Sequence, residues 1–387
     1  MLRNLNAIAP LITMFFLITY AMINTVVFIE QQMGLVSFRP LFDIPGWVAP
    51  LGVIGCIAAM FIVNPPFGLI AVVVVMAFYA YLARRHLKAP FGDVRSGVFV
   101  SVSEWAAKKV SRLPEDRTRG WKANLLAPVR DPARLRGDFR ILHSLAYPRG
   151  SVTLLGVTET EAPDFSRQMR WLSSAFRGED LFSSWAVVND DDFGRAVVSA
   201  GSALEAAFFQ PNVDFLSLEE DRGDEGQLLS VANVAAQHTR LGLLVFAEHA
   251  KAGLGRQGSI NLHIRRPEAG WAWQDELGSL NLAALACYKL RENWQAEMRI
   301  LAWVHDEDEK DAAREYIRRL VELGRLEGIS PVVRVGSEGP SPDGVPPADL
   351  HCLATDGCDF DEIRRMRDGM HASCLVVPSA GNASVLA

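Results

Sequence analysis

Residues 151–188 read SVTLLGVTETEAPDFSRQMRWLSSAFRGEDLFSSWAVV, which is a short apolar segment, an amphipathic segment and a second short apolar segment. The segments 151–157 and 184–188 have the length and composition of buried strands, whereas 164–176 places apolar residues at helical spacing. A strand, a helix and a strand in this order are typical of a parallel sheet that carries helices on both faces. The stretch therefore predicts an α/β fold.

The same alternation continues on both sides of this stretch. Further strands are predicted at 124–129, 213–218, 241–247, 259–264, 297–304, 332–335, 348–354 and 374–378, and helices at 133–146, 194–209, 226–239, 280–292, 310–323 and 361–370. These elements fall into two successive sets of similar size. We therefore expect a duplicated α/β unit, with parallel-sheet half-domains at 121–252 and 253–387 and a boundary near residues 251–258.

The first part of the chain differs in composition. Residues 7–29 and 44–83 contain no Asp, Glu, Lys or Arg, and Asn64-Pro65-Pro66 interrupts the second run. A spanning helix needs about 20 apolar residues, and proline cannot continue a helix. The pattern therefore predicts three transmembrane helices, near 6–29, 47–63 and 66–83, in a membrane region 1–92 that contacts lipid. A cleavable signal peptide is the alternative interpretation of the first run.

Basic residues follow the third predicted span. Arg84, Arg85 and Lys88 form the densest positive cluster beside any of the three, and positive charge marks the cytoplasmic side of a membrane. We therefore expect an integral protein of the inner or plasma membrane whose carboxy-terminal domain is cytoplasmic. Residues 93–120 are predicted to form a connecting amphipathic helix and linker, with an apolar stripe that packs on the membrane interface or on another domain.

Two polar residues of the first predicted span share one helical face. Tyr20 and Asn24 are four residues apart, and an amide in hydrocarbon has to find hydrogen bonds. This face should meet protein or a water-filled cavity, so a helix–helix contact and a ligand-facing pair both remain open. No Asp, Glu, Lys or Arg lies within the three predicted spans, which leaves no carrier for a proton relay there.

The remaining sequence contains few motifs that indicate chemistry. Residues 253–258, GLGRQG, have the spacing of a dinucleotide-binding loop, but they precede a predicted strand instead of following one, which favours a hinge between half-domains. The acidic runs 190–192 and 305–309 precede predicted helices and are interpreted as caps. We recognise no catalytic constellation, metal-binding histidine pair or cofactor loop, so the sequence predicts no enzyme, no metal site and no cofactor. The net charge of −6 argues against a nucleic-acid partner.

Five short segments occur in a fixed order along the chain: LNAIAP at 5–10, YAMIN at 20–24, SFRPLF at 37–42, YAY at 79–81 and WKANLL at 121–126. In this order they resemble the last three transmembrane helices and the cytosolic start of the cation-chloride cotransporters, the sodium-potassium-chloride and potassium-chloride carriers. Ala123 stands where that family has a proline, which indicates a divergent, prokaryotic-type member.

This resemblance implies a secondary active transporter of the amino acid-polyamine-organocation superfamily, of which the chain would be the last three helices and the cytosolic domain. The domain would consist of two universal-stress-protein-like halves that form a homodimer and regulate transport. Tyr20 falls where the tenth helix of the family carries a tyrosine that helps to hold chloride, so it is the candidate ion-binding residue. The solutes would be chloride, potassium or sodium ions, or an amino acid or amine. The alternative is a membrane-anchored cytosolic sensor whose stress-protein-like domain binds a nucleotide.

Overall fold

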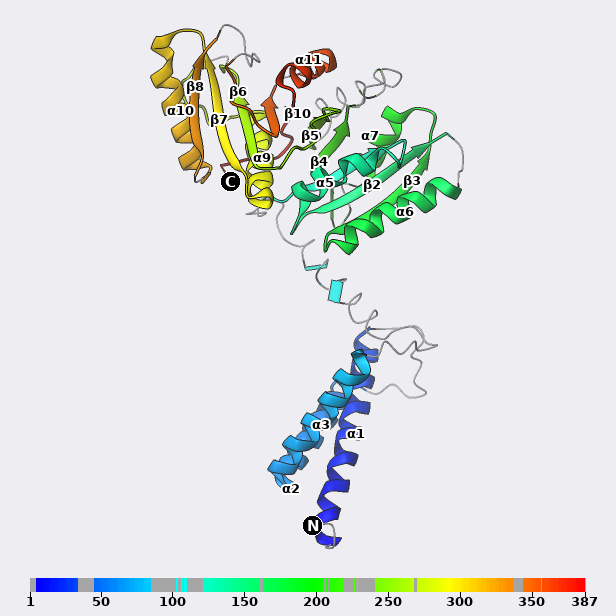
Figure 1. Ribbon diagram of the computed structural model, residues 1–387. Coiled ribbons are helices and arrows are strands. Elements are labelled where there is room, and N and C mark those ends of the chain that lie inside the picture. The colour runs from blue at the N-terminus through cyan, green and yellow to red at the C-terminus, as the bar shows by residue number, and fades with distance from the viewer. Residues whose placement is uncertain are drawn as a thin grey trace. The chain divides into compact units, whose positions relative to one another are not determined.

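The chain divides into two compact units, Met1–Arg117 and Thr118–Ala387 (Figure 1). The structure is a computed structural model. It describes residues 5–33, 45–84, 121–159, 163–204, 209–218, 241–267, 270–326, 328–336, 344–355 and 357–386, together with a few isolated positions. The described part of the first unit contains α1 (Leu5–Met33), α2 (Val48–Val63) and α3 (Pro65–Arg84).

A small apolar core holds these three helices together. It consists of Met14 and Ile18 of α1, Met60 of α2 and Ala71 of α3. Between α2 and α3, Pro65 occupies the first helical position, where its missing N–H is not needed. The Asn64 side-chain oxygen accepts a hydrogen bond from the Phe67 N–H at 3.3 Å and so caps α3. The Asn-Pro-Pro segment therefore ends one helix and begins the next.

The prediction of three transmembrane helices is wrong for the described residues. Side chains are described for residues 12–28 of α1, 48–63 of α2 and 65–77 of α3. Within this part of the chain, no helix combines the length and the apolar character that crossing a membrane requires.

The second unit contains one ten-stranded sheet. Its strands are β1 (Asn124–Val129), β2 (Ser151–Thr158), β3 (Phe182–Asn189), β4 (Val213–Ser217), β5 (Gly242–Ala247), β6 (Ser259–Ile264), β7 (Glu297–Val304), β8 (Ser330–Val335), β9 (Leu350–Ala354) and β10 (Ser373–Ser379). They are arranged in the order β3-β2-β1-β4-β5-β10-β9-β6-β7-β8. Each half of the sheet thus repeats the order third, second, first, fourth, fifth, and the second half runs in the opposite direction across the sheet.

All neighbouring strands are parallel except β5 and β10, which pair antiparallel through Ala247–Cys374, Phe246–Leu375 and Val245–Val376. The local sequence predicted two separate layers, whereas the structure has one continuous sheet. The reason is that β5 and β10 would each be the exposed edge of its own half. Pairing them satisfies the backbone N–H and C=O groups that both edges would leave open.

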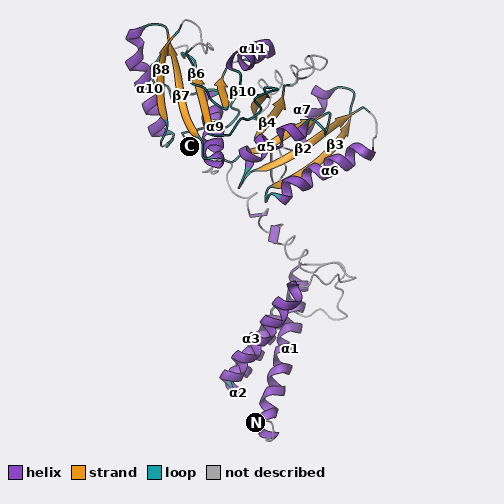
Figure 2. Cartoon of the chain, in the orientation of Figure 1, coloured by secondary structure: helices purple, strands orange, loops and turns teal. Residues whose placement is uncertain are grey.

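Helices cover both faces of this sheet (Figure 2). They are α5 (Leu135–Ala146), α6 (Pro163–Gly178), α7 (Phe193–Leu204), α9 (Leu280–Trp294), α10 (Lys310–Leu323) and α11 (Phe360–Met370), with a short 3-10 helix at Glu307–Glu309. The larger apolar core lies under α5, α6, α9 and α10, and includes Leu142, Phe176, Leu290 and Ile317. A smaller core lies on the other face under α7 and α11.

The predicted strands and most predicted helices are confirmed to within a few residues at their ends. The exceptions are the predicted helices within 93–120 and at 226–239, which fall almost entirely outside the described residues.

Leu375→Ala tests whether the two half-domains share one folding unit. Leu375 is fully buried on β10 opposite Phe246 of the other half. Its truncation should lower the free energy of unfolding of residues 118–387 by about 2–5 kcal/mol. Both halves should unfold in a single transition in the variant, as in the wild type. Urea denaturation followed by tryptophan fluorescence and far-UV circular dichroism measures this. Leu323→Ala, at an exposed position of α10, is the matched control and should change stability by about 0.5 kcal/mol or less.

Candidate functional site

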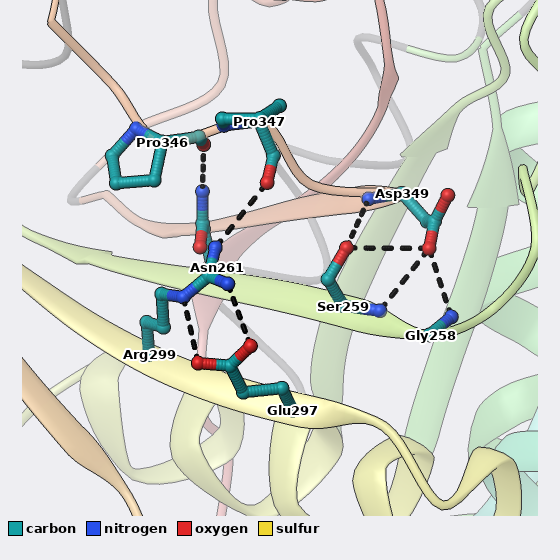
Figure 3. Close-up of polar contacts among 8 residues, drawn as sticks. All are labelled: Gly258, Ser259, Asn261, Glu297, Arg299, Pro346, Pro347 and Asp349. Carbon is teal, nitrogen blue, oxygen red and sulfur yellow. Dashed lines mark hydrogen bonds and ion pairs between the residues drawn. The ribbon is translucent and has the colours of Figure 1, made fainter.

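The glycine segment 253–258 wraps around an internal carboxylate. Asp349, which directly precedes β9, accepts hydrogen bonds from the backbone N–H groups of Arg256 at 3.1 Å, Gly258 at 2.8 Å and Ser259 at 3.1 Å. The Ser259 hydroxyl donates a fourth at 3.2 Å (Figure 3). Gly255 has φ +54°, and a Cβ there would lie 2.1 Å from Asp349 Oδ1. Glycine is therefore required at position 255, because the carboxylate approaches the backbone so closely there.

This arrangement also sets the charge of Asp349. Partial burial on its own would raise the pKa of the carboxyl, but the hydrogen bonds from Arg256, Gly258 and Ser259 outweigh it and leave the pKa below its usual range. Asp349 is therefore an anion held by N–H groups, in the way that a phosphate would be held. The sequence analysis found the loop but missed Asp349, which is about ninety residues away in the chain.

The first half-domain contains the equivalent contact. Val213 pairs with Leu125 as Leu350 pairs with Ile260, so Asn212 occupies the position of Asp349. The Asn212 side-chain oxygen accepts from the Asn124 N–H at 2.9 Å, and its amide donates to the Lys122 carbonyl at 2.8 Å. We call the Asn212 and Asp349 contacts the Asx latches. Each latch joins the amino ends of two adjacent strands. The Asn212 latch uses a side-chain amide, and the Asp349 latch uses a carboxylate.

Polar side chains also line one face of the second half-domain. Asn261 donates to the Pro346 carbonyl at 2.7 Å, and Arg299 donates to the Pro347 carbonyl at 3.3 Å while it pairs with Glu297 at 2.6 Å (Figure 3). These contacts hold the segment that precedes β9 against β6 and β7. The same segment carries Asp349 and so positions the second latch.

A buried histidine pair lies farther along these strands. Trp303 Nε1 donates to His263 Nδ1 at 3.3 Å, so His263 Nε2 carries the proton and donates to His351 Nδ1 at 2.9 Å. Burial lowers the pKa of His263 to about 3 and that of His351 to about 4. Both rings are therefore neutral at ordinary pH. No group of three or more His, Cys, Asp or Glu side chains in the described part of the chain is arranged to hold a metal ion.

The carboxyl ends of the strands form two further candidate sites. In a doubly wound sheet, ligands bind where the strand order reverses, which here is between β1 and β4 and between β6 and β9. A small cavity of about 50 Å³ lies at the first point, lined by side chains that include Arg130, Arg134, Asp138, Phe193 and Ser217.

A larger cavity of about 400 Å³ lies at the second reversal point, and its lining includes Arg265, Thr355 and Glu362. Arg265 forms an ion pair with Glu362 across this cavity. The two arginines Arg130 and Arg265 follow directly after the equivalent strands β1 and β6. The duplication has therefore placed a guanidinium at both reversal points.

Asp138 is the most unusual group in the first cavity. It is 5% exposed, and its carboxylate oxygen accepts a hydrogen bond from the Ser217 hydroxyl at 3.1 Å. Burial raises the pKa of Asp138 to about 7; the bond from Ser217 lowers it in part, and the nearby charge of Glu248 raises it further. Asp214 on β4 is also buried, and burial raises its pKa to about 7. Sequence spacing gave no sign of either group.

The sequence-predicted residues of the first unit lie on α1. Tyr20 is 57% exposed, and its backbone carbonyl accepts a hydrogen bond from the Asn24 amide at 2.8 Å. The Asn24 side chain lies against α2, since a Cβ on Gly52 would be 2.9 Å from its Cγ. Asn24 therefore makes a helix–helix contact. The ion-binding role of Tyr20 stays a prediction.

One of the two acidic runs forms a helix cap. Asp192 Oδ1 accepts a hydrogen bond from the Arg195 N–H at 2.9 Å at the start of α7, and Asp190 pairs with the Arg195 guanidinium. In the run 305–309, Glu309 accepts a bond from the His305 N–H at 3.2 Å, but neither Asp306 nor Glu309 caps its helix with its side chain. The cap interpretation is confirmed for 190–192 and is wrong for 305–309.

Comparison with known proteins identifies the family. Residues 127–254 match the model of the prokaryotic cation-chloride cotransporter C-terminal domain, first part, and residues 255–386 match the model of the second part. The crystal structure of the cytoplasmic domain of a prokaryotic cation chloride cotransporter is 34% identical, with a TM-score of 0.61, and the match covers 69% of this chain and 99% of that chain. The chain belongs to the prokaryotic cation-chloride cotransporter family. The resemblance found in the sequence is thereby confirmed.

Weaker similarity extends to universal stress proteins. One from Archaeoglobus fulgidus DSM 4304 is 10% identical, with a TM-score of 0.42, over 67% of this chain and 97% of that chain. A putative universal stress protein from Pseudomonas aeruginosa UCBPP-PA14 is 11% identical, with a TM-score of 0.43, over 67% of this chain and 94% of that chain.

Asp349→Ala tests the second Asx latch. The substitution leaves three backbone N–H groups without their acceptor and should lower the free energy of unfolding of residues 118–387 by about 1–3 kcal/mol at pH 7. Because folding depresses the pKa of Asp349, the contribution is present above the pKa of the unfolded chain, about 3.9, and is lost as the pH falls. The difference between wild type and variant should therefore shrink in acid. Urea titrations at several pH values measure it. Asp164→Ala, at a carboxylate that is 80% exposed, is the control and should cost about 1 kcal/mol or less.

Proposed function

We propose that residues 118–387 act as the cytoplasmic dimerisation and regulatory module of a cation-chloride cotransporter. The observation that carries this proposal is the 34% identity to a cytoplasmic domain of the family, over 99% of that domain. The consecutive order of the two family matches supports it, because the second begins where the first ends. The intact transporter would move chloride with potassium or sodium, or an amino acid or amine.

The chemistry of the described domain suits such a role. Its two Asx latches, its capped helices and its neutral histidine pair are all satisfied within the domain. We propose that the module acts by changing its assembly or conformation and that it is not an enzyme. Coupling to transport would pass from this unit to the rest of the transporter.

Sedimentation of residues 90–387 tests the dimerisation. This fragment includes the whole second unit and the predicted amphipathic helix, whose apolar stripe motivates a partner. We expect a dimer at micromolar concentration. A monomer throughout the high micromolar range would contradict the proposed dimerisation. Residues 118–387 serve as the control, which shows whether the segment before the sheet domain is required.

Deletion of the module tests regulation in the intact transporter. Vesicles with the full protein and vesicles with the protein lacking residues 118–387 should differ in the rate or ion dependence of radiolabelled chloride uptake. Equal uptake by both at equal amounts of inserted protein would argue against a regulatory role.

The rival function, a nucleotide sensor, makes an opposite prediction. The N–H groups of the glycine segment already hold the Asp349 carboxylate, so ATP would have to displace a covalently tethered anion. We expect calorimetric titration of residues 118–387 with ATP to show no saturable binding at micromolar concentration. Saturable binding to the wild type, strengthened by Asp349→Ala because that variant frees the N–H groups, would make the sensor the better interpretation.

A further inference from the structure

Asp138 and Glu248 lie together at the junction of the two half-domains. Glu248 follows β5 directly, at the point where the chain leaves the first half. A Cβ on Gly137 of α5 would be 3.3 Å from Glu248 Oε2, and a Cβ on Gly253 would be 3.6 Å from Glu248 Oε1. The Glu248 carboxylate therefore sits between α5 and the glycine segment, at the residue of α5 that precedes Asp138, and its charge raises the pKa of Asp138.

The backbone around Glu248 is tied to the second half. Arg367 of α11 donates to the Glu248 carbonyl at 3.3 Å, and the His249 N–H donates to the Ser373 hydroxyl of β10 at 3.0 Å. The Ser373 hydroxyl in turn donates to the Gly253 carbonyl at 2.5 Å. Any movement of Glu248 would therefore be transmitted to α11, β10 and the glycine segment that surrounds Asp349.

The carboxyl of Asp138 accepts its hydrogen bond from a neutral group, the Ser217 hydroxyl. Of the cations in the same cavity, Arg134 pairs with Asp131 at 3.6 Å, and the Arg130 guanidinium lies over the Phe193 ring at 4.7 Å.

On the side of the second half, Arg367 pairs with Asp368 at 2.8 Å, and the His249 and His371 rings are 6.3 Å apart. Burial also raises the pKa of Glu248. Burial and the nearby charge of Glu248 both favour a proton on Asp138, and the hydrogen bond from the Ser217 hydroxyl offsets this only in part.

We propose that Asp138 and Glu248 form a proton-binding site that controls how tightly α5 holds the glycine segment, and through it the junction of the half-domains. With one proton bound, the pair carries a single negative charge and packs between α5 and Gly253. When the proton leaves, two carboxylates face each other in a partly dry site. Glu248, the less buried of the two, relieves the repulsion by turning toward water and loosens residues 248–257. The inference rests on the second unit alone and would give the proposed module a response to cytoplasmic pH.

The sign of the stability effect follows from the proton balance. The pKa of Asp138 is higher in the folded chain, so the folded state binds more protons than the unfolded state between about pH 4 and pH 7. The stabilisation is fully present in acid and is lost as the pH rises through 7. Asp138→Asn mimics the protonated form and should abolish this pH dependence.

The experiment uses residues 118–387, which contain the entire sheet and both of its apolar cores. The side-chain carbon of Asp138 is titrated by NMR with ¹³C-labelled aspartate, in the wild type and in Glu248→Gln. Hydrogen exchange of residues 248–257, corrected for the intrinsic pH dependence of exchange, is measured at pH 6 and pH 8 in the wild type and in Asp138→Asn. Asp164→Asn, at an exposed carboxylate of α6, is the matched control.

We expect the Asp138 midpoint to lie between pH 6 and pH 8 and to fall in Glu248→Gln. Exchange of 248–257 should increase severalfold from pH 6 to pH 8 in the wild type and in Asp164→Asn, and should stay constant in Asp138→Asn. An Asp138 midpoint below pH 5 would overturn the proposal, as would exchange that responds to pH equally in wild type and Asp138→Asn. If Asp138→Asn fails to fold, the wild-type midpoint and its change in Glu248→Gln still decide the matter.

Discussion

The antiparallel pairing of β5 with β10 is the constraint on which the second unit depends. Every other neighbouring pair in the sheet is parallel and lies within one half, so this ladder alone makes one sheet out of two repeats. The pairing places β5 and β10 at the centre of one sheet instead of at two edges, and Val245, Phe246, Leu375 and Val376 are buried there. The larger apolar core then runs without interruption from α5 and α6 to α9 and α10.

The two halves repeat one design and differ where their surroundings differ. Each fixes the amino ends of its first and fourth strands with an Asx side chain, but Asn212 can donate to a carbonyl, whereas Asp349 only accepts. The carboxylate is matched by the N–H groups of Arg256, Gly258 and Ser259, which converge on it. The change from an amide to a carboxylate is therefore accompanied by a glycine-containing segment before the second half.

Electrostatics in this domain is dominated by desolvation and hydrogen bonding. Asp349 and Asp138 are both carboxyls near the half-domain boundary, yet their pKa values move in opposite directions. Asp349 is surrounded by N–H donors, which favour the anion, whereas Asp138 is buried with one hydroxyl and faces a second acid. The first therefore behaves as a structural anion and the second as a group that can exchange a proton near neutral pH.

The sequence by itself determined the elements of the second unit. Strand and helix periodicity, together with helix caps such as Asp192, gave nearly every described element, since these signals act between residues a few positions apart. Short motifs that occur in the same order as in the cation-chloride cotransporters indicated the family. The sequence also suggested three transmembrane helices, but in the described part of the chain no helix is both long and apolar enough to cross a membrane.

Only the tertiary structure decided the rest. Three contacts join residues that are far apart in the chain. They are the pairing of β5 with β10, the hydrogen bonds between Asp349 and the glycine segment, and the interactions of Asp138 with Ser217 and Glu248. No local pattern encodes such contacts, because they arise when the sheet closes and excludes water. The same exclusion of water moves the pKa values that give these carboxyls their separate roles.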